Sequence, residues 1–365
     1  MFRSRVVWVV IVLAVVSFPG QAIHADPGGA DSCAARDAAI ATPGCGVATS
    51  IYGVEMRALA AEMAAHPRPD LSPIPIDEKM LYQRAYRRVI KETDVYDGPG
   101  GAVVGHIDSG FTFVNAGQEK DGWIQIRPNQ WLPKDTLGPV NKAVSKFSGV
   151  ALPDGLPAQP FGWVLLDTKP SRTPGAKPDD AARVLKRYTL INLFAAENVD
   201  GWDWFLVGPN QWIVQTRIAR LQPVRRPEGV SGKWFAVDLY EQTLTAYDDH
   251  KAVFATLISS GLPKFPTTEG LFKIFERYPL VKMSGASGQP DFYYLPQVPW
   301  VMYFNQDEQA LHGAYWHDGF GYRHSHGCIN MSMTDAQWAF NWTQSTPDAY
   351  VYVYHSGEYK QGGPR

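Results

Sequence analysis

Beginning at Lys233, apolar and polar residues alternate at every second position, the pattern of β-strands with one buried face. These alternating runs are separated by the turn residues Glu241-Gln242 and Asp248-Asp249-His250. The positions expected on the buried side are Phe235, Val237, Leu239, Val253, Ala255 and Leu257. The pattern therefore predicts a β-meander that covers a core with one of its faces.

The rest of this region adds two strands and a helix. A strand is predicted at 271–275, after a Pro/Thr/Gly loop, and a closing strand at 350–355, with the sequence YVYVYH. Between them, MTDAQWAFNW (333–342) has Thr334 as the expected N-cap and Gln337, three residues later, as its capping-box partner. We therefore expect one helix near the end of a mainly β domain.

Two earlier stretches resemble each other. DGWIQIRPNQWLP begins at Asp121 and DGWDWFLVGPNQWIV begins at Asp200, and each follows short β-rich runs with Gly and Pro turns. The pair resembles bacterial SH3-type repeats, which implies two small SH3-like β-barrels at 85–140 and 160–224. Aromatic residues in such barrels either form core or line a ligand groove, and core is the more common case. The residues concerned are Trp123, Trp131, Trp202 and Trp212.

The first 25 residues have the pattern of a secretory signal. A basic start is followed by an apolar run from Val6 to Phe18, which is too short for a comfortable membrane span, and then by Pro19-Gly20. We therefore expect export to the cell envelope, with a membrane partner only if this segment remains uncleaved. Residues 26–84 are read as an N-terminal segment with a helix at 54–66 and an extended linker at 67–77.

Composition narrows the function classes. The 365 residues are 45% hydrophobic with a formal net charge of −2, so no basic excess points to nucleic acid. The chain has three cysteines, and in an oxidising compartment the simplest pairing joins Cys33 to Cys45. Cys328 is then an odd free thiol, which in an exported protein calls for a chemical reason.

That thiol lies within a histidine-rich stretch, HGAYWHDGFGYRHSHGCINMS (312–332). If HSHGCIN is extended, His324, His326 and Cys328 share one face. A free cysteine has a pKa of about 8.5, so a nearby imidazole is needed to take its proton. The imidazole in turn needs an acceptor on its other nitrogen, either a carboxylate such as that of Asp318 or a backbone carbonyl such as that of Gly313.

A zinc site is the competing interpretation, because zinc also accepts histidine and cysteine. The stretch has neither an HExxH nor a CxxC spacing, it has no second cysteine, and Asp318 is its only acidic residue. We therefore expect no metal and no other cofactor. Packing of the four histidines of this stretch and Cys328 as plain core is less favoured still, since each buried imidazole would need hydrogen-bond partners.

Several ordered motifs resemble the catalytic domain of the L,D-transpeptidase (YkuD-like) family. His312-Gly313 is followed, after a loop, by Ser325-His326-Gly327-Cys328-Ile329-Asn330. SSGLPKFPTTEGLFKI (259–274) is similar to the family's upstream signature but has Thr268 where the family has proline, and MYFNQDEQALHG (302–313) matches the approach to the histidine. The resemblance covers 232–356 and implies a mostly antiparallel β-sandwich with a flanking helix.

The resemblance also implies roles for residues. Cys328 would be the nucleophile, His312 the general acid/base, and the Gly313 carbonyl its orienting acceptor. Ser325 and His326 would shape the nucleophile loop. The remaining site residues implied are the oxyanion N–H groups of Gly327 and Cys328 and the substrate contacts Tyr303, Trp316 and Asn330. His317 and His324 are not assigned a catalytic role.

The function implied is an exported peptidoglycan L,D-transpeptidase. Cys328 would attack a tetrapeptide stem, D-Ala would leave, and an amine of a second stem would capture the acyl group as a 3→3 cross-link. β-Lactams of the carbapenem class would be inhibitors. Two alternatives stay open: an L,D-carboxypeptidase on the same site, with water as the acceptor, and a non-catalytic wall-binding protein.

Overall fold

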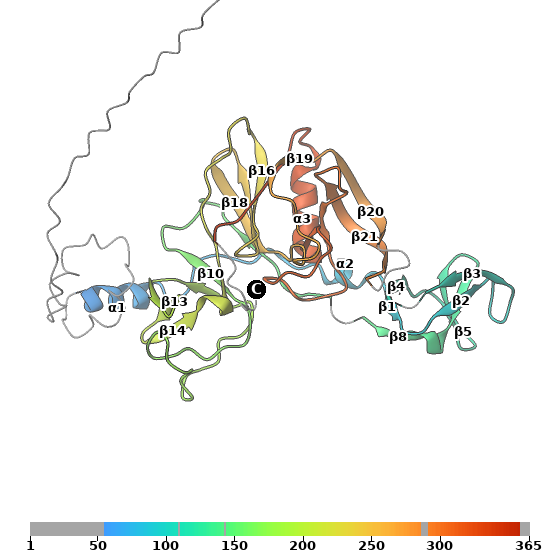
Figure 1. Cartoon of the computed structure of the whole chain (residues 1–365), viewed down its shortest axis with the longest axis horizontal. Helices are drawn as coiled ribbons and strands as arrows, with labels where there is room; N and C mark the ends of the chain where they lie inside the picture. The colour runs from blue at the N-terminus through green and yellow to red at the C-terminus, as the bar shows by residue number, and fades with distance from the viewer. Residues whose placement is uncertain (1–54, 109, 142–143, 286–290, 358–365) are drawn as a thin grey trace, which may run out of the picture. The chain divides into compact units, whose positions relative to one another are not determined.

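The computed structural model describes residues 55–108, 110–141, 144–285 and 291–357 (Figure 1). The predicted signal segment and the predicted Cys33–Cys45 disulfide lie outside these residues. The described part is mainly β, as predicted, and the helix expected at 54–66 is present. Its helices are α1 (Glu55–Ala65), α2 (Glu78–Tyr82) and α3 (Met333–Gln344).

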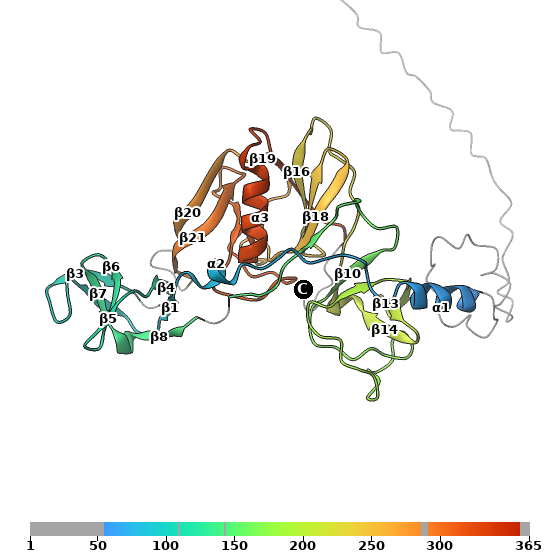
Figure 2. The same ribbon diagram turned by 180° about the vertical axis from the view of Figure 1, so that it is seen from behind.

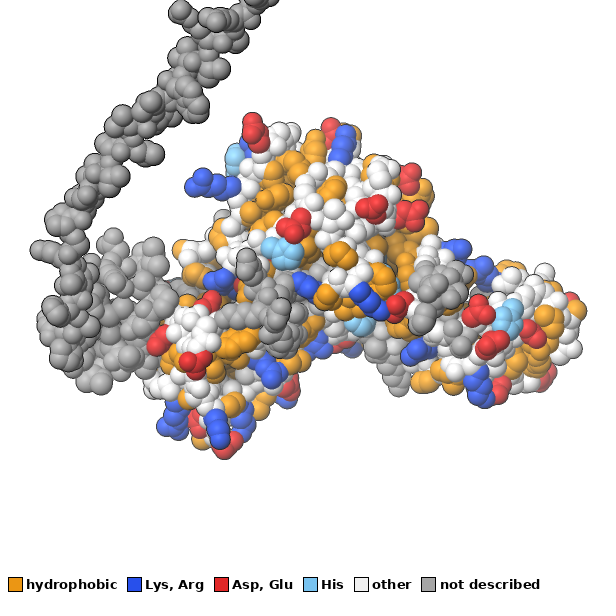
Figure 3. Space-filling view, in the orientation of Figure 1, with side chains coloured by type: hydrophobic (Ala, Val, Ile, Leu, Met, Phe, Trp, Pro, Cys, Tyr) orange, Lys and Arg blue, Asp and Glu red, His pale blue; other side chains and the backbone are white. Residues whose placement is uncertain are grey.

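None of the described helices is both long and apolar enough to cross a membrane. On the face drawn in Figure 3, acidic and basic side chains are interspersed. This mixture agrees with the formal net charge of −2 for the whole chain.

The two internal repeats form small β units that share part of their strand pairing. In the first, β1 pairs antiparallel with β4 and β8, and β3-β2-β7-β6-β5 form a second sheet. The bounds are β1 (Tyr86–Val89), β2 (Thr93–Tyr96), β3 (Val103–Ile107), β4 (Phe111–Asn115), β5 (Glu119–Lys120), β6 (Trp123–Arg127), β7 (Gln130–Pro133) and β8 (Leu137–Val140).

In the second repeat, β10 pairs with β11 and β15 as β1 does with β4 and β8, and β12-β13-β14 correspond to β5-β6-β7. A short 3₁₀ helix precedes the last strand in both units, at Lys134–Thr136 and Gln215–Arg217. The bounds are β10 (Phe161–Val164), β11 (Leu190–Asn192), β12 (Ala195–Val199), β13 (Trp202–Gly208), β14 (Gln211–Val214) and β15 (Ile218–Arg220). The repeat is therefore structural, while its SH3-like character stays a prediction.

Turn chemistry explains why the two copies fold alike. Asp121-Gly122 has φ of 49° and 83°, and Asp200-Gly201 has φ of 51° and 77°. Two successive positive φ values make the tight hairpin turn that Asp-Gly favours, because glycine has no Cβ to clash there. The shared Asp-Gly pair thus fixes the same hairpin in both units.

The repeat tryptophans divide into two kinds. Trp131 and Trp212 are buried core residues, as the more common interpretation predicts. Trp123 and Trp202 are only partly buried, at the start of β6 and β13. The matched pairs therefore play equivalent parts in the two units.

The domain that begins at Lys233 has two sheets with α3 between them (Figures 1 and 2). The first sheet has the order β19-β24-β16-β17-β18-β9, and the second runs β23-β22-β21-β4-β1-β8 with β20 paired to β21. The bounds are β9 (Val150–Ala151), β16 (Lys233–Asp238), β17 (Thr243–Asp248), β18 (Lys251–Leu257), β19 (Gly270–Lys273), β20 (Glu276–Gly285), β21 (Tyr293–Tyr303), β22 (Ala310–Gly313), β23 (Ile329–Met331) and β24 (Tyr350–Tyr354). The strands expected near 271–275 and 350–355 are β19 and β24.

The predicted meander is present as β16-β17-β18, but the prediction of a single buried face was wrong. Phe235, Val237 and Phe254 face the core that contains α3. Ala255 and Leu257 instead join a second core on the other side of the sheet. That face is buried because the segment from Phe147 to Leu165, far away in sequence, covers it.

The N-cap of α3 was also predicted two residues too late. Ser332 is the N-cap, and its Oγ accepts the N–H of Asp335 at 3.1 Å. Thr334 lies inside the first turn, and its hydroxyl has no partner among the described residues. Serine at this position satisfies one of the free N–H groups that every helix start leaves.

Asp335 ties the start of α3 to two other segments. Its carboxylate accepts the Gly149 N–H at 2.8 Å and the Thr256 hydroxyl at 2.6 Å, and the residue is 0% exposed. Burial raises the pKa of this carboxyl from 3.8 to about 6, although the hydrogen bonds oppose the shift.

This raised pKa gives a testable prediction. Because the folded pKa lies above the usual value, the folded state holds the proton more tightly, and stability falls as pH rises from about 4 to about 6. The shift corresponds to roughly 3 kcal/mol. We expect Asp335→Asn to lose this pH dependence. The difference between the two proteins in the free energy of unfolding, measured with urea, should therefore change with pH. A difference that is constant between pH 4 and 7.5 would contradict the prediction.

The first repeat is joined to the second sheet by main-chain pairing. β4 runs parallel to β21, with Phe111 opposite Tyr293 and Thr112 opposite Tyr294. Alternation along β4 then sends Phe113 to the core beside β21 and Val114 to the core of the repeat. β4 is therefore a wall shared by two cores.

Candidate active site

The His-Gly and His-Gly-Cys motifs meet through two parallel strands. β22 ends with His312-Gly313 and β23 begins just after Cys328, with His312 opposite Asn330 in the register. His312 is 2% exposed, whereas Cys328 is partly buried. The chain pairing thus brings the predicted nucleophile and the predicted base to one end of the second sheet.

The contacts of His312 fix its tautomer. Its Nδ1 lies 3.2 Å from the carbonyl oxygen of Gly313, which can only accept, so Nδ1 carries the proton. Nε2 is then left with a free lone pair. Burial lowers the pKa of His312 from 6.5 to about 4, so the ring is neutral at physiological pH. A neutral imidazole with a free Nε2 is the form that can take a proton.

The thiol of Cys328 is also neutral at rest. Burial raises its pKa from 9.0 to about 11, and the nearby Glu308 adds to the shift. Its Sγ lies 3.9 Å from the Glu308 carbonyl oxygen, a distance suited to a weak S–H donor. The pair is therefore a thiol and an imidazole, not a preformed thiolate and imidazolium.

The nucleophile loop is not extended, contrary to the expectation for HSHGCIN. Gly327 has φ +117°, which turns the chain between His326 and Cys328. The ring of His324 packs against His317 with centroids 4.1 Å apart, while His326 packs against Phe265 at 4.4 Å. The two histidines therefore contact different partners and do not lie along one face of an extended strand.

Ser325 holds the loop from within. Its Oγ donates to the Cys328 carbonyl and accepts the Gly327 N–H at 3.1 Å. The Gly327 N–H, which the resemblance implies as an oxyanion donor, is thus directed at Ser325 in this structure. The Cys328 N–H is the other donor that the resemblance implies.

The upstream signature anchors this loop from outside. Thr267 accepts the Gly261 N–H at 2.9 Å and donates to the Gly327 carbonyl at 2.8 Å. Thr268, which stands where the family has proline, donates its N–H to Gln309 Oε1 at 3.0 Å. Proline has no N–H, so this bond is a consequence of the departure. At φ +117° any residue with a Cβ would be strained, so this position favours glycine.

His317 and Asn330 form a buried polar pair behind His312. The Gly319 N–H donates to His317 Nδ1 at 3.0 Å, and burial keeps the pKa of His317 well below its usual value. The ring proton must then be on Nε2, which lies 2.9 Å from the Asn330 side-chain amide. An amide turned so that its oxygen accepts this proton also satisfies Asn330 Oδ1, which otherwise has no partner among the described residues.

Asp318 is not the acceptor that orients the His312 imidazole. Its side chain accepts from the hydroxyls of Ser145 and Tyr188, and Arg187 donates to its backbone carbonyl. Of the two acceptors considered for the imidazole, the structure thus places the Gly313 carbonyl, and not Asp318, against the ring. Asp318 instead links the loop between His312 and Cys328 to the second repeat.

Sequence reasoning missed Tyr293 and Glu308 beside the thiol. Tyr293 packs against His326 with centroids 5.0 Å apart, and burial raises its pKa to about 12, so its hydroxyl remains a donor. The expected substrate contacts Tyr303 and Trp316 lie partly buried in the same cluster as Cys328. Tyr293 begins β21, a strand with no catalytic motif, so no sequence signal marked it as a residue of the site.

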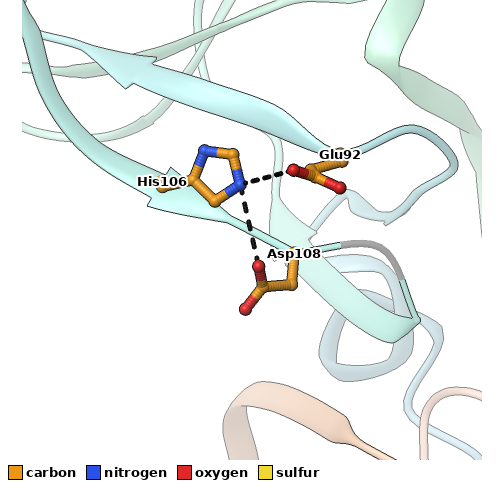
Figure 4. Close-up of side chains that lie close together, drawn as sticks. All are labelled: Glu92, His106 and Asp108. Carbon is orange, nitrogen blue, oxygen red and sulfur yellow. Dashed lines mark hydrogen bonds and ion pairs between the residues drawn. The ribbon is translucent and has the colours of Figure 1, made fainter. Parts of the chain in front are cut away.

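Among the described residues, three side chains of types that can bind a metal lie close together on the first repeat, apart from Cys328. They are Glu92, His106 and Asp108 (Figure 4). All three are exposed, and His106 lies 3.2 Å from Glu92 and 2.8 Å from Asp94. These carboxylates raise the pKa of His106, the bond to Asp94 most of all. The group is an exposed ion-pair cluster apart from Cys328.

Residues 232–353 match the family described as YkuD, the L,D-transpeptidase catalytic domain. No curated protein matches the chain. Among solved structures, L,D-transpeptidase 3 from Mycobacterium tuberculosis is 19% identical, with 44% of this chain and 71% of that chain covered and a TM-score of 0.32. The catalytic domain of the E. faecium L,D-transpeptidase is 26% identical, with 34% and 99% covered and a TM-score of 0.31.

An L,D-transpeptidase solved in complex with imipenem is 16% identical, with 56% of this chain and 90% of that chain covered and a TM-score of 0.32. These likenesses over the whole chain are low, so the assignment rests on the family match. The match begins one residue before β16 and ends within β24, and it includes His312 and Cys328. Residues 232–353 are therefore an L,D-transpeptidase catalytic domain of the YkuD family.

Proposed function

We propose that the protein is an exported peptidoglycan L,D-transpeptidase with Cys328 as its nucleophile. The observation that carries this proposal is the bond from His312 Nδ1 to the Gly313 carbonyl, which leaves Nε2 as the free base of the site. The family match supports the reaction class, and the parallel register of β22 and β23, with His312 opposite Asn330 and Cys328 just before β23, supports the pairing of the two residues in the reaction.

The proposed chemistry follows from the neutral resting pair. Cys328 Sγ attacks the carbonyl between the diamino acid and the terminal D-Ala of a tetrapeptide stem while its proton passes to His312 Nε2. The carbonyl oxygen becomes an oxyanion near the Cys328 N–H. His312 then returns the proton to the leaving amine of D-Ala, and a thioester remains. A second stem's amine attacks the thioester, loses a proton to His312, and releases the 3→3 cross-linked product.

The acceptor distinguishes this function from that of an L,D-carboxypeptidase. With water as the acceptor, the same thioester would give a tripeptide and no dimer. Incubating the protein with disaccharide-tetrapeptide and reading the products by mass spectrometry tests the choice: we expect cross-linked dimer. Tripeptide as the sole product would assign the carboxypeptidase, and neither product, with Cys328 intact, would favour a non-catalytic wall-binding protein.

Export is part of the proposal, supported by the signal-like first 25 residues and by the location of the wall outside the cell. Capture of carbapenems is a second part. A relative has been solved with imipenem, and a β-lactam carbonyl offers Cys328 the same attack without a leaving group that can diffuse away. Imipenem is therefore a suitable probe for the thiol.

The pH dependence of acylation is a further expected result. With a pKa of about 4 for His312 and about 11 for Cys328, neither group changes charge in the free enzyme between about pH 5 and pH 9. We expect the second-order rate of imipenem acylation to be flat over this range and to fall below about pH 4, where His312 is protonated. The measurement is intact-mass kinetics at a series of pH values. A bell-shaped profile with limbs near pH 6 and 8 would show a thiolate–imidazolium pair instead.

A further inference from the structure

The loop that leads from β22 to the nucleophile is held by two residues of the second repeat. The Tyr188 hydroxyl lies 2.9 Å from both the carbonyl oxygen and Oδ1 of Asp318, and the Arg187 guanidinium donates to the same carbonyl. The Asp318 carboxylate also accepts the Ser145 hydroxyl and lies 3.7 Å from Arg187 Nη1. We call these four residues together the Asp318 contact.

The backbone of Tyr188 adopts an uncommon conformation at this contact. Its φ is +66°, a left-handed value that bulky side chains rarely adopt. Main-chain bonds hold it, from the Tyr188 N–H to the Val164 carbonyl at 2.6 Å and from the Thr189 N–H to the Lys186 carbonyl at 3.0 Å. Such conformations cost free energy and cluster at sites where the geometry has a function. Tyr188 is a residue of this kind, and its hydroxyl reaches the catalytic domain.

Both side chains of the second repeat are fixed by further packing. The Tyr188 ring packs against Phe147 with centroids 4.5 Å apart, and the Arg187 guanidinium lies over the Tyr188 ring at 4.3 Å. The Arg187 N–H donates to Asp167 Oδ1 at 2.9 Å. A planar guanidinium that stacks on a ring loses less freedom when it also binds a carbonyl. Each side chain is therefore held by contacts other than the one to Asp318.

The Asp318 contact lies two residues from an aromatic neighbour of the proposed base. The Trp316 ring packs against the His312 ring with centroids 5.6 Å apart. On the other side of Trp316 in the sequence, Tyr315 stacks on Tyr86 of the first repeat with centroids 3.5 Å apart. Trp316 therefore lies between an anchor on the first repeat and an anchor on the second.

The orientation of His312 depends on packing because its hydrogen bond is long. The distance from Nδ1 to the Gly313 carbonyl oxygen, 3.2 Å, is at the upper end of the normal range. Nε2 has to remain free for the proton of the thiol, so it offers no second hydrogen bond to fix the ring. Packing against Trp316 therefore contributes to the alignment of the imidazole. A displacement of about 1 Å in a reacting group can cost on the order of 10² in rate.

We propose that Arg187 and Tyr188 are positioning residues for the reaction at Cys328. By holding Asp318 they keep Trp316 against the imidazole of the base, which stays aligned for proton transfer. The second repeat is then a working part of the active site and not only a module joined to it. This inference rests on the proposed function in one respect, the role of the imidazole as the base.

Three variants change the Asp318 contact by different amounts. Tyr188→Phe removes the hydroxyl and keeps the ring that packs on Phe147. Arg187→Ala removes the guanidinium, whereas Arg187→Lys keeps a cationic donor at the same position. The lysine variant should therefore lose less than the alanine variant if donation to Asp318 is what matters.

The matched control for the arginine is Arg226→Ala. Arg226 has the same side-chain exposure as Arg187, 28%, and pairs with Asp249 at 2.9 Å in the turn before β18. That turn is at the start of β18, whereas the residues that follow its end include Ser259, which pairs with Asn330 beside the site.

The control for the tyrosine is Tyr247→Phe. It removes a hydroxyl of another buried tyrosine, which accepts the Val224 N–H at 3.4 Å.

The experiment is imipenem acylation of the full chain at pH 7, followed by intact mass over a range of imipenem concentrations, with thermal unfolding of the same samples. For Tyr188→Phe and Arg187→Ala we expect the maximal acylation rate to fall about tenfold. The half-saturating concentration should change less than about twofold, because the loss lies in the chemical step. Arg187→Lys should retain part of the lost rate, and both controls should match the wild type.

A spectroscopic measurement follows the base itself. The His312 ring N–H that bonds to the Gly313 carbonyl should give a ¹H–¹⁵N signal that is absent from His312→Ala. We expect this signal to shift or broaden in Tyr188→Phe and Arg187→Ala and to stay unchanged in Arg226→Ala. A merely structural role would lower the melting temperature but leave this signal and the maximal rate of the folded protein unchanged, and that result would overturn the proposal.

A double variant tests whether Tyr188 acts through Asp318. Once Asp318→Ala has removed the carboxylate, adding Tyr188→Phe should lower the rate little further, because residues in one network are not additive. Fully additive losses would also overturn the proposal.

The products separate this inference from the proposed function. If the wild type is acylated but forms no dimer, the transpeptidase function fails, while the positioning effect on acylation stands. If the wild type forms dimer and Tyr188→Phe and Arg187→Ala acylate at its rate, the function stands and the positioning role is wrong.

Discussion

Cys328→Ser is expected to abolish both imipenem capture and turnover of the tetrapeptide. His312 has a pKa of about 4, so it is a weak base that suits a thiol far better than the much less acidic serine hydroxyl. We expect acylation to fall by at least about 10³-fold, to below detection in intact-mass spectra. The side chain is only partly buried, so the change in the free energy of unfolding should stay within about 1 kcal/mol.

The control is thermal unfolding of the same sample, which must show a folded protein. The variant also keeps Cys33 and Cys45, so an imipenem adduct on either of them, in protein that lacks their predicted disulfide, will remain visible. Adducts at the wild-type level on Cys328→Ser would remove Cys328 as the nucleophile. If Cys328→Ser loses both its adducts and its folded state, Cys328→Ala is the variant to test next. Alanine places no new hydroxyl at this partly buried site.

Local signals in the sequence predicted most of the elements. Alternation located β16, β17 and β18, and the two Asp-Gly turns identified the duplicated hairpins, because both signals act within a few residues. The order of the motifs located the family domain, since a nucleophile and its base need fixed residue types. The strands, turns and catalytic motifs depend on residues that are close together in the sequence, so the sequence alone is enough to predict them.

Long-range pairing could not be predicted from those signals. β4 of the first repeat pairs with β21, about 180 residues later, and no turn or spacing sets that register. The same is true of β9 and β18, whose pairing helps to bury the second face of the meander. The packing of Tyr293 in the cluster that contains Cys328 is likewise a long-range contact, so sequence reasoning had no access to it.

The prediction of an extended nucleophile loop was wrong for a different reason. Period-two alternation in HSHGCIN satisfies a strand pattern, but Gly327 adopts a φ of +117° that strand residues avoid. An anchor outside the loop holds this turn, because the Thr267 hydroxyl donates to the Gly327 carbonyl. Alternation over four or five residues is too short to exclude such a turn when glycine is present.

His312→Ala is expected to lower the rate of imipenem acylation by roughly 10²–10⁴-fold, the usual range for loss of a general base. The bond to the Gly313 carbonyl leaves Nε2 free, and that lone pair has no substitute in an alanine side chain. The measurement is intact-mass kinetics at pH 7. Added imidazole should restore part of the rate, because it supplies the missing base without altering the protein.

Variants of the neighbouring histidines separate a proton carrier from a structural residue. His324 is exposed, so His324→Ala should cost little. His317 is buried with both ring nitrogens engaged, so His317→Ala should lower the melting temperature more than the acylation rate. His326 packs against Phe265 and Tyr293, and its loss should disturb the loop without any rescue by imidazole.

The order of the four effects also tests the zinc interpretation. Zinc ligands act as a set, so their variants would lose activity together and release metal with it. A single proton carrier gives one large loss at His312, rescue by imidazole at that position only, and no metal dependence. If His312→Ala acylates at nearly the wild-type rate, the thiol must lose its proton by another route. The neutral thiol–imidazole pair would then not be the catalytic unit, however well the motif matches.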